Sequence, residues 1–279
     1  MKIADLHPFP DNPFHVAEDG QLAELTESIK EFGVVTPIIT RPKEDGNGYE
    51  VIAGQRRVRA SQLAGIETVP AFVLPLDRDR AIITLVDSNI QRENILPSER
   101  AFAYKMKLEA MKHQAGRPTQ DNYSQVGNNF GTLSSEEMAE ELGTSKNQIF
   151  RYIRLTNLVP ELLDMVDEKK IAFNPAVELS YLDESQQRDF LEAMNDTQNA
   201  PSLSQAQQLK KMAQQGDFSY EKAFDVMGQE KKSEKDTVTI KNETLRKYFP
   251  RSYTPKQMEE KIIQLLDAWQ KKQQRRNER

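Results

Sequence analysis

The period of the hydrophobic pattern changes near residue 75, and this change constrains the fold more than any other feature of the sequence. Before it, short β-branched runs such as VVTPIITRP and GNGYEVIAG alternate with helical segments such as QLAELTESIKEFG. After it, apolar residues recur at helical spacing, and this pattern continues to about residue 195. We therefore predict an α+β fold, in which a small mixed α/β domain precedes an all-helical domain and a helical C-terminal tail.

The length and composition favour several small domains. With 279 residues, of which 37% are hydrophobic, the chain suits two or three small domains better than one large core. We predict an N-terminal domain over residues 1–95, a helical domain over 96–200 and a C-terminal region over 201–279. Two stretches without an apolar period, residues 115–133 and the charged segment GQEKKSEKDT, are interpreted as linkers.

Composition also excludes several kinds of chemistry. The chain has no cysteine, which excludes disulfides, thiolate nucleophiles and Cys-ligated zinc, and its three histidines are not spaced like metal ligands on one helix. No apolar run approaches the roughly 20 residues that cross a bilayer, and the first residues do not resemble a signal peptide. We expect a cytoplasmic protein without a membrane partner. The net charge of -5 still permits a local basic surface for DNA.

The strongest local signal is the segment SSEEMAEELGTSKNQIFRYIRL. Ala139, Gly143 and Ile149 have the spacing of a helix-turn-helix, with a small residue where the helices cross, a glycine in the turn and a branched residue that holds the second helix. Ser134 and Glu137 predict a capping box at the start of the first helix. An ordinary αα-hairpin with a polar outer face is the alternative.

The predicted helix-turn-helix covers residues 135–155, and its second helix runs over about Lys146–Leu155. In such a motif this helix enters the major groove of double-stranded DNA, where outward side chains donate to bases and phosphates. The predicted DNA-binding residues are Ser145, Lys146, Asn147, Gln148 and Arg151.

A second candidate site is AGQRRVRA, residues 53–60, which places three arginines behind a glycine. An apolar strand turns at Gly54 and enters a helix, whose first N–H groups and partial positive charge suit an anion. Arg56 and Arg57 are adjacent and can hold different oxygens of a polyphosphate. A solvated helix face is the alternative. The chain contains neither GxxxxGKS nor GxxxxGKT, which excludes a P-loop.

Three short segments, GVVTPIITRP, GQRRVRA and SNIQREN, follow one another ahead of the helix-turn-helix. In sequence and in order they resemble the three N-terminal boxes of the ParB family of plasmid and chromosome partition proteins, and the resemblance covers residues 1 to about 195. It implies an N-terminal domain that acts as a CTP-binding switch and a helix-turn-helix that engages specific DNA. It further implies a homodimer that closes on DNA as a clamp, and a partition ATPase as another partner.

The resemblance also implies roles for individual residues. The nucleotide-binding residues that it implies are Thr36, Pro37, Gly54, Gln55, Arg56, Arg57, Ala60, Asn89 and Arg92. Asn89 is expected near a Mg2+ ion that offsets the triphosphate charge and keeps most of its water shell. Two positions depart from the family, because Gln55 and Ser88 stand where glutamates are usual. The second of these glutamates is expected to help with metal binding or hydrolysis, so the sequence supports CTP binding more strongly than CTP hydrolysis.

The C-terminal segment permits two interpretations. Met258, Ile262, Leu265 and Trp269 form an apolar stripe at helical spacing. This stripe either pairs two copies of the chain or docks on its own chain as an ordinary core helix.

Two other function classes remain open. The first is a site-specific transcription regulator of a mobile element, in which the α/β domain has lost its nucleotide and binds only protein. The second is a metal-dependent nuclease that uses Asp87, Glu93 and Glu99, although these residues are more simply explained as acids on a helix surface.

Overall fold

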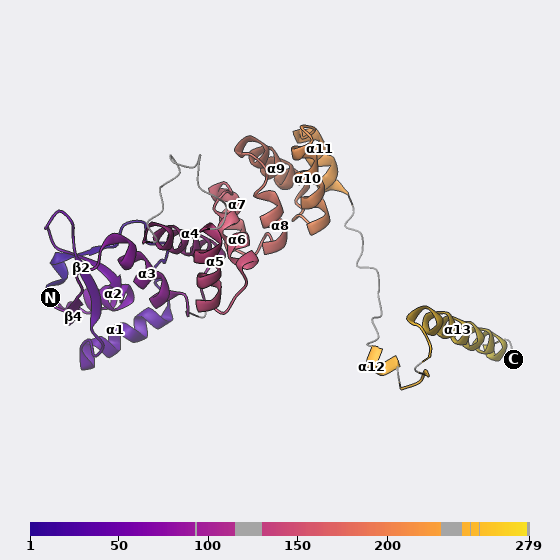
Figure 1. Cartoon of the computed structure of the whole chain (residues 1–279), viewed down its shortest axis with the longest axis horizontal. Coiled ribbons are helices and arrows are strands. Elements are labelled where there is room, and N and C mark those ends of the chain that lie inside the picture. Colours follow the sequence, from indigo (N-terminus) through magenta and orange to yellow (C-terminus); the bar gives the residue numbers. More distant parts are fainter. Residues whose placement is uncertain (93, 115–129, 230–241, 246, 251, 278–279) are drawn as a thin grey trace. The chain divides into compact units, whose positions relative to one another are not determined.

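The computed structural model describes residues 1–92, 94–114, 130–229, 242–245, 247–250 and 252–277. They belong to two compact units, Met1–Gln229 and Glu230–Arg279, which are described separately (Figure 1). Within the described ranges, no helix combines the length and the apolar character needed to cross a membrane. Most of the two predicted linkers lies outside these ranges.

A four-stranded sheet forms the N-terminal part of the first unit. Its strands are β1 (Leu6–Pro8), β2 (Ile38–Pro42), β3 (Tyr49–Ala53) and β4 (Ala71–Val73), in the spatial order β1-β3-β2-β4. The central strands β2 and β3 are antiparallel, whereas each edge strand pairs in parallel with its neighbour. Ile38, Val51 and Ile52 of the central strands are buried. The mixed sheet confirms the predicted α/β domain.

Four helices accompany this sheet (Figure 1). They are the 3-10 helix η1 (Ile3–Asp5), α1 (Gly20–Phe32), α2 (Gln55–Leu63) and α3 (Arg78–Asn89). The chain leaves α1 at Gly33, where a φ of 71° favours glycine, as the sequence predicts. Leu22 of α1 packs with Ala60 of α2, and Leu85 of α3 packs with Ile52 of β3. These contacts hold the start of α2 directly after the buried strand β3.

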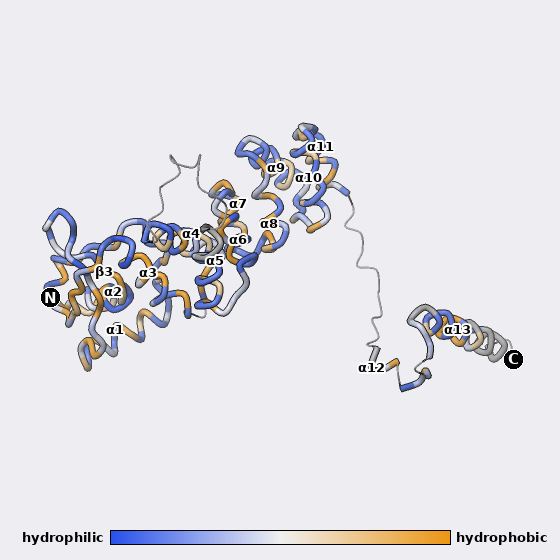
Figure 2. The backbone as a smooth tube through the Cα atoms, in the orientation of Figure 1, coloured by the Kyte–Doolittle hydropathy of each residue, from blue (hydrophilic) through white to orange (hydrophobic). Residues whose placement is uncertain are grey.

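The remainder of the first unit is helical, which confirms the predicted change of pattern. Its helices are α4 (Pro97–Gln114), α5 (Phe130–Glu141), α6 (Lys146–Leu155), α7 (Pro160–Asp167), α8 (Phe173–Leu179), α9 (Glu184–Thr197), α10 (Leu203–Gln214) and α11 (Tyr220–Gly228). The largest hydrophobic core lies among them and includes Leu162, Phe190 and Leu209. Figure 2 shows hydrophobic and hydrophilic residues interspersed along these helices, as expected when one face of each is buried.

Helical structure extends farther than the sequence pattern predicts. The pattern ends near residue 195, yet α10 and α11 continue the fold to Gly228. Each of these helices buries few residues, such as Ala206 and Leu209 in α10 and Ala223 in α11. Their apolar faces are short and contain alanine, so periodicity marks them weakly while packing against α8 and α9 stabilises them.

The start of α5 differs from the sequence prediction. The helix begins at Phe130, so Ser134 lies more than one turn inside it, where a backbone N–H has an intrahelical acceptor. Both Ser134 and Ser135 are buried. The predicted capping box of Ser134 and Glu137 is therefore wrong, because the first turn of the helix precedes it.

The described residues of the second unit form the helices α12 (Asn242–Leu245) and α13 (Pro255–Asn277). Met258 is buried, whereas Leu265 and Trp269 are about 60% exposed. The apolar stripe predicted from the sequence thus lies on a helix, and most of its length faces solvent.

Candidate nucleotide and DNA sites

The first candidate site is the start of α2, where Gly54 is the residue that precedes the helix. Its φ of 100° and ψ of 23° place it in the left-handed region, which favours glycine. A Cβ at this position would lie 2.8 Å from Cγ2 of Ile38 in β2 and 3.1 Å from Cζ of Arg57. Only glycine lets the backbone turn this closely past the central strand. The turn leaves the first N–H groups of α2 at the carboxyl end of β3.

Arg57 binds the segment that leads into β2. Its Nη1 donates to the carbonyl oxygens of Thr36 and Pro37, each at 2.5 Å. Burial lowers the pKa of the Arg57 guanidinium from its usual range. The structure therefore brings Thr36, Pro37, Gly54 and Arg57 together, and it gives Arg57 a structural role in holding α2 against the first box.

Arg56 and Arg59 of α2 form ion pairs with acidic residues at the start of α1. Nη2 of Arg56 donates to Oδ1 of Asp19 at 2.7 Å, and Arg59 pairs with Glu18. Asp19 is also the N-cap of α1, since it accepts from the Leu22 N–H at 2.9 Å. Hydrogen bonds from Arg56 and then from Leu22 lower the pKa of Asp19. Carboxylates therefore pair with two of the three arginines of AGQRRVRA, of which Arg56 is one that the family resemblance assigns to the nucleotide.

Sequence reasoning missed Glu18 and Asp19, because no motif contains them. The only signal that could have found them is the N-cap position of Asp19 ahead of an amphipathic helix.

The third box lies at the end of α3. Asn89 is buried and its Nδ2 donates to the carbonyl of Leu85 at 2.8 Å and to Oγ of Ser88 at 3.2 Å. The backbone N–H of Arg92 donates to the carbonyl of Asn89 at 3.0 Å. In the described residues, neither Asn89 nor Arg92 has a hydrogen bond with residues 54–60. The described hydrogen bonds thus connect the first and second boxes, and none of them connects the third box to α2.

The acidic residues near the third box do not form a metal centre. Asp87 accepts from Nζ of Lys107 at 2.6 Å, and the buried Glu99 accepts from the backbone N–H of His15 at 2.8 Å. Glu93 lies outside the described residues. Over the described ranges, no group of three acidic or histidine side chains is arranged to hold a metal ion. These contacts do not favour the nuclease alternative.

The second candidate site is the helix-turn-helix formed by α5 and α6. Gly143 has a φ of 60° in the turn, and Ser145 is the N-cap of α6, accepting from the Gln148 N–H at 3.2 Å. Ala139 and Ile149 are buried between the two helices. The spacing read from the sequence therefore produces the expected packing, and α6 spans Lys146–Leu155 as predicted.

The predicted DNA-binding residues on α6 differ in exposure and in their partners. Ser145 and Asn147 are exposed, whereas Lys146 pairs with Glu136 at 3.6 Å. Arg151 donates to Oδ1 of Asn174 and lies over the ring of Phe173, with Cζ 5.2 Å from the ring centroid. Sequence reasoning missed Phe150, which is 39% exposed on this helix. Its exposure depends on how α6 packs on α4, which residue spacing alone does not determine.

Comparison with known proteins assigns the family. Residues 1–90 match the ParB N-terminal domain, and residues 120–215 match the ParB HTH domain. The chain belongs to the ParB family. Both candidate sites lie inside these matches, the α2 site in the first domain and α6 in the second.

Curated ParB relatives align with the same part of the chain. The chromosome-partitioning protein Spo0J of Thermus thermophilus is 33% identical over 184 residues, which are 66% of this chain and 60% of that protein. Stage 0 sporulation protein J of Bacillus subtilis is 34% identical over 168 residues, 60% of this chain and 52% of that protein. The chain thus spans between half and three fifths of the length of these two relatives.

Solved ParB structures align more loosely. The C-terminally truncated ParB of Caulobacter crescentus complexed to the centromeric parS site has a TM-score of 0.42 and 22% identity, covering 81% of this chain and 96% of that one. The same truncated protein complexed with CTP-gamma-S has a TM-score of 0.31 and 28% identity, covering 64% of this chain and 89% of that one.

The two residues that depart from the ParB boxes, Gln55 and Ser88, both donate side-chain hydrogen bonds to nearby backbone carbonyls. Nε2 of Gln55 donates to the carbonyls of Val51 at 3.2 Å and Ile52 at 3.3 Å. Oγ of Ser88 donates to the carbonyl of Leu85 at 2.9 Å. A glutamate carboxylate accepts hydrogen bonds and cannot donate to these carbonyls. In this ParB-family chain, Gln55 therefore ties the start of α2 to β3.

Proposed function

We propose that this chain is a sequence-specific, double-stranded DNA-binding partition protein, whose N-terminal domain binds CTP with Mg2+ and controls a homodimeric clamp on DNA. The observation that carries the proposal is the start of α2, where the left-handed Gly54 leads into a helix that begins with Arg56 and Arg57, in a chain that also matches the ParB HTH domain. A partition ATPase is the further partner expected from the family resemblance.

The chemistry of the α2 site suits a triphosphate. The free N–H groups at a helix start and nearby guanidinium groups stabilise phosphate oxygens. Two of these guanidinium groups already hold carboxylates, since Arg56 pairs with Asp19 and Arg59 with Glu18. A triphosphate carries more negative charge than either carboxylate, so we expect it to displace them from the arginines.

The third box is the part of the proposed site that no described hydrogen bond connects to α2. We expect Asn89 and Arg92 to complete the nucleotide site by contacting CTP directly. When bound, Mg2+ would neutralise phosphate charge, with Asn89 as its protein ligand and water as most of its shell. Ser88 supplies no carboxylate, and Asp87 is paired with Lys107, so we expect CTP to be held rather than rapidly hydrolysed.

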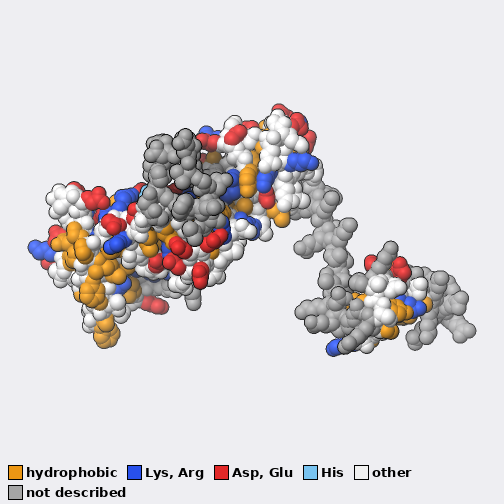
Figure 3. Space-filling view, in the orientation of Figure 1, with side chains coloured by type: hydrophobic (Ala, Val, Ile, Leu, Met, Phe, Trp, Pro, Cys, Tyr) orange, Lys and Arg blue, Asp and Glu red, His pale blue; other side chains and the backbone are white. Residues whose placement is uncertain are grey.

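The DNA side of the proposal uses the outer face of α6. Asn147 can read base edges in the major groove, the ring of Phe150 can contact a thymine methyl group, and Lys146 can contact phosphates. Figure 3 shows acidic and basic side chains interspersed on the face in view rather than one broad basic surface. We therefore expect DNA affinity to depend on this local set of side chains.

Calorimetric titration tests the nucleotide part. CTP is titrated into the protein in Mg2+, with ATP and GTP as controls, with and without duplexes that the protein selects from a random-sequence pool. We expect CTP-selective binding that is lost in Arg56→Ala and retained in Arg78→Ala. Arg78 is a matched control because it also lies at a helix start, that of α3, and pairs with an aspartate, Asp11. DNA binding without CTP binding under any condition would favour the transcription-regulator alternative.

A further inference from the structure

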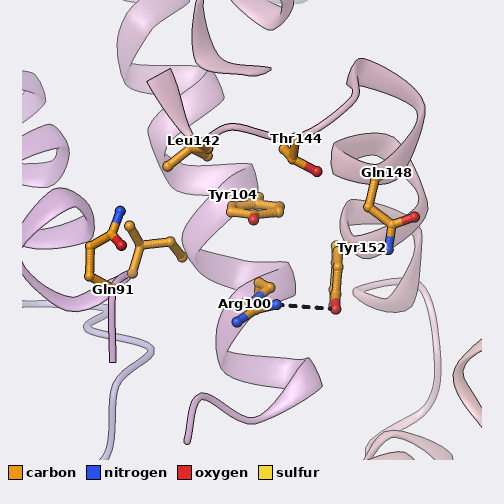
Figure 4. Close-up of a pocket in the computed structure, with 8 residues that line it drawn as sticks. Gln91, Arg100, Tyr104, Leu142, Thr144, Gln148 and Tyr152 are labelled. Atoms are coloured by element: carbon orange, nitrogen blue, oxygen red, sulfur yellow. Dashed lines mark hydrogen bonds between the residues drawn. The ribbon is translucent and has the colours of Figure 1, made fainter. Parts of the chain in front are cut away.

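A cavity of about 340 Å3 lies where the end of the nucleotide domain meets the helix-turn-helix (Figure 4). Gln91 follows α3, Arg100 and Tyr104 belong to α4, Thr144 lies in the turn before α6, and Gln148 and Tyr152 belong to α6. None of the side chains that line it is acidic. The lining therefore combines one guanidinium with amides and hydroxyl groups, a set suited to an anion.

Arg100 is the charged group of this cavity, and its hydrogen bonding is incomplete. Its Nη1 donates to Oη of Tyr152 at a long 3.3 Å, and its Cζ lies 5.4 Å from the centroid of that ring. Its Nε is buried and has no hydrogen-bond partner in the described part of the chain. An unmet buried donor on a charged group costs free energy that an incoming acceptor recovers.

A comparison with Arg41 and Arg56 shows that Arg100 lacks a carboxylate partner among the described residues. The buried Arg41 donates from Nε to Glu50 at 2.6 Å, and Arg56 reaches Asp19 at 2.7 Å. Arg100 forms no ion pair with any residue that the structure describes, although it is partly buried. Half-buried arginines without a carboxylate partner otherwise satisfy their donors with strong neutral acceptors, since Arg57 donates to the Thr36 and Pro37 carbonyls and Arg154 to the Ser180 carbonyl at 2.6 Å. Arg100 differs from them because it lines a cavity and its Nε has no acceptor among the described residues.

The polar side chains beside Arg100 can donate hydrogen bonds to an anion that binds its guanidinium group. Oε1 of Gln148 accepts from Nη1 of Arg151 at 3.5 Å, which leaves the Gln148 amide N–H groups for another acceptor. Thr144 adds a hydroxyl group from the helix-turn-helix turn, and Gln91 adds an amide from the segment after α3. Tetrahedral phosphate oxygens can accept from several such donors at once, and guanidinium groups bind phosphate by paired hydrogen bonds.

We propose that this Arg100 pocket binds a phosphate group and that the DNA backbone supplies it. The source is argued from position, because Thr144 and Gln148 belong to the turn and the first turns of α6, the part of a helix-turn-helix that approaches phosphates beside the major groove. This inference rests on the proposed DNA-binding function. A phosphate in the pocket would contact Gln91 and α6 together, and so would tie the end of the nucleotide domain to the DNA-reading helix.

The salt dependence of DNA binding tests the pocket. Each neutralised phosphate contributes about -0.9 to the slope of log K against log salt concentration. We expect Arg100→Gln to make the slope shallower by about one and to weaken binding roughly tenfold at moderate salt. Arg78→Gln removes the same charge from the start of α3 and should leave the slope unchanged. Arg100→Lys should keep the slope, since a lysine retains the charge, while losing part of the affinity.

A second measurement identifies the source of the phosphate. It uses the wild-type protein, so a loss of signal cannot come from a variant that fails to fold. The Nε–H resonance of Arg100 is followed in the wild-type full-length chain while duplex DNA or inorganic phosphate is added at constant ionic strength. A shift with DNA and none with millimolar phosphate supports the DNA backbone, whereas a shift with phosphate alone overturns that source in favour of a free anion. An unshifted resonance with DNA that does bind overturns the pocket, and absence of DNA binding by the wild type instead overturns the proposed function.

Discussion

The Nζ of Lys107 donates to Oδ1 of Asp87 across 2.6 Å. The same ammonium donates to Oε2 of Glu141, also at 2.6 Å, and the lysine side chain is only 1% exposed. Asp87 belongs to α3, Lys107 to α4 and Glu141 to α5, so one buried charge joins the N-terminal domain to the helix-turn-helix. The pairing also accounts for Asp87, which the sequence offered as one of three acids of a metal-dependent nuclease.

Replacing Lys107 with methionine should destabilise the first unit. The change keeps the bulk of the side chain but leaves Asp87 and Glu141 without their shared cation. Because these carboxylates are 48% and 55% exposed and water can hydrate them, we expect a cost of about 1 kcal/mol. We expect the free energy of unfolding in urea to fall by about that amount. Lys105→Met is the matched control, because Lys105 is exposed on the same helix and its loss should change stability little. Equal effects of the two changes would contradict a structural role for the triad.

The same triad predicts a dependence of stability on alkaline pH. Burial alone would lower the pKa of Lys107, but hydrogen bonds from its ammonium to Asp87 and Glu141 outweigh burial and raise it. A raised folded-state pKa means that the stabilisation is present below the unfolded value of about 10.4 and is lost as pH rises through the folded value. Unfolding curves between pH 9 and about 11.5 should therefore converge for the wild type and Lys107→Met. A constant difference over this range would contradict the prediction.

Replacing Asp19 with asparagine should strengthen CTP binding. The change frees Arg56 from its carboxylate, and asparagine is still a good N-cap for α1, so stability should be preserved. Because the pair is exposed, we expect a gain of roughly twofold to fivefold in affinity by calorimetry. Asp77→Asn makes the same exchange at the N-cap of α3 and should leave CTP affinity unchanged. Weaker binding in Asp19→Asn would mean that the carboxylate assists the nucleotide instead of competing with it.

A methyl group at Gly54 should damage both the fold and the α2 site. Alanine at a φ of 100° is strained, and its Cβ would lie 2.8 Å from the Ile38 side chain, so we expect a loss of about 2 kcal/mol in unfolding free energy together with CTP binding. Gly20→Ala is the control, because a Cβ there has no neighbour within 4 Å. If Gly54→Ala unfolds the domain at room temperature, loss of CTP binding carries no weight, and the stability measurement alone tests the prediction.

The outer face of α6 should separate sequence reading from simple charge attraction. Asn147→Ala removes a base-reading amide and should cost about 1–3 kcal/mol with selected DNA while affecting random duplexes little. Lys146→Ala should weaken both kinds of duplex and reduce the salt slope by about one. Lys170→Ala, an exposed lysine paired with Glu168 before α8, serves as the control. If Asn147→Ala weakened random and selected DNA equally, the base-reading role would be wrong.

Local sequence determined most of the elements. The Gly33 end of α1, the strand and the helix on either side of Gly54, and the spacing of Ala139, Gly143 and Ile149 all depend on residues close in the chain. Periodicity and turn residues record such local requirements directly, and so they predicted the α+β fold and the helix-turn-helix. The order of the three boxes likewise pointed to the ParB family before any contact was known.

Only the tertiary structure decided which charges meet. Arg56 pairs with Asp19 across 37 positions of sequence, Lys107 with Glu141 across 34, and Arg100 donates to the Tyr152 phenol across 52. Side chains this far apart come together because helices pack on one another, and their spacing in the sequence carries no record of that packing. The sequence by itself therefore determined the elements and the family, while the fold decided which arginines pair with carboxylates and placed Arg100 beside a cavity without one.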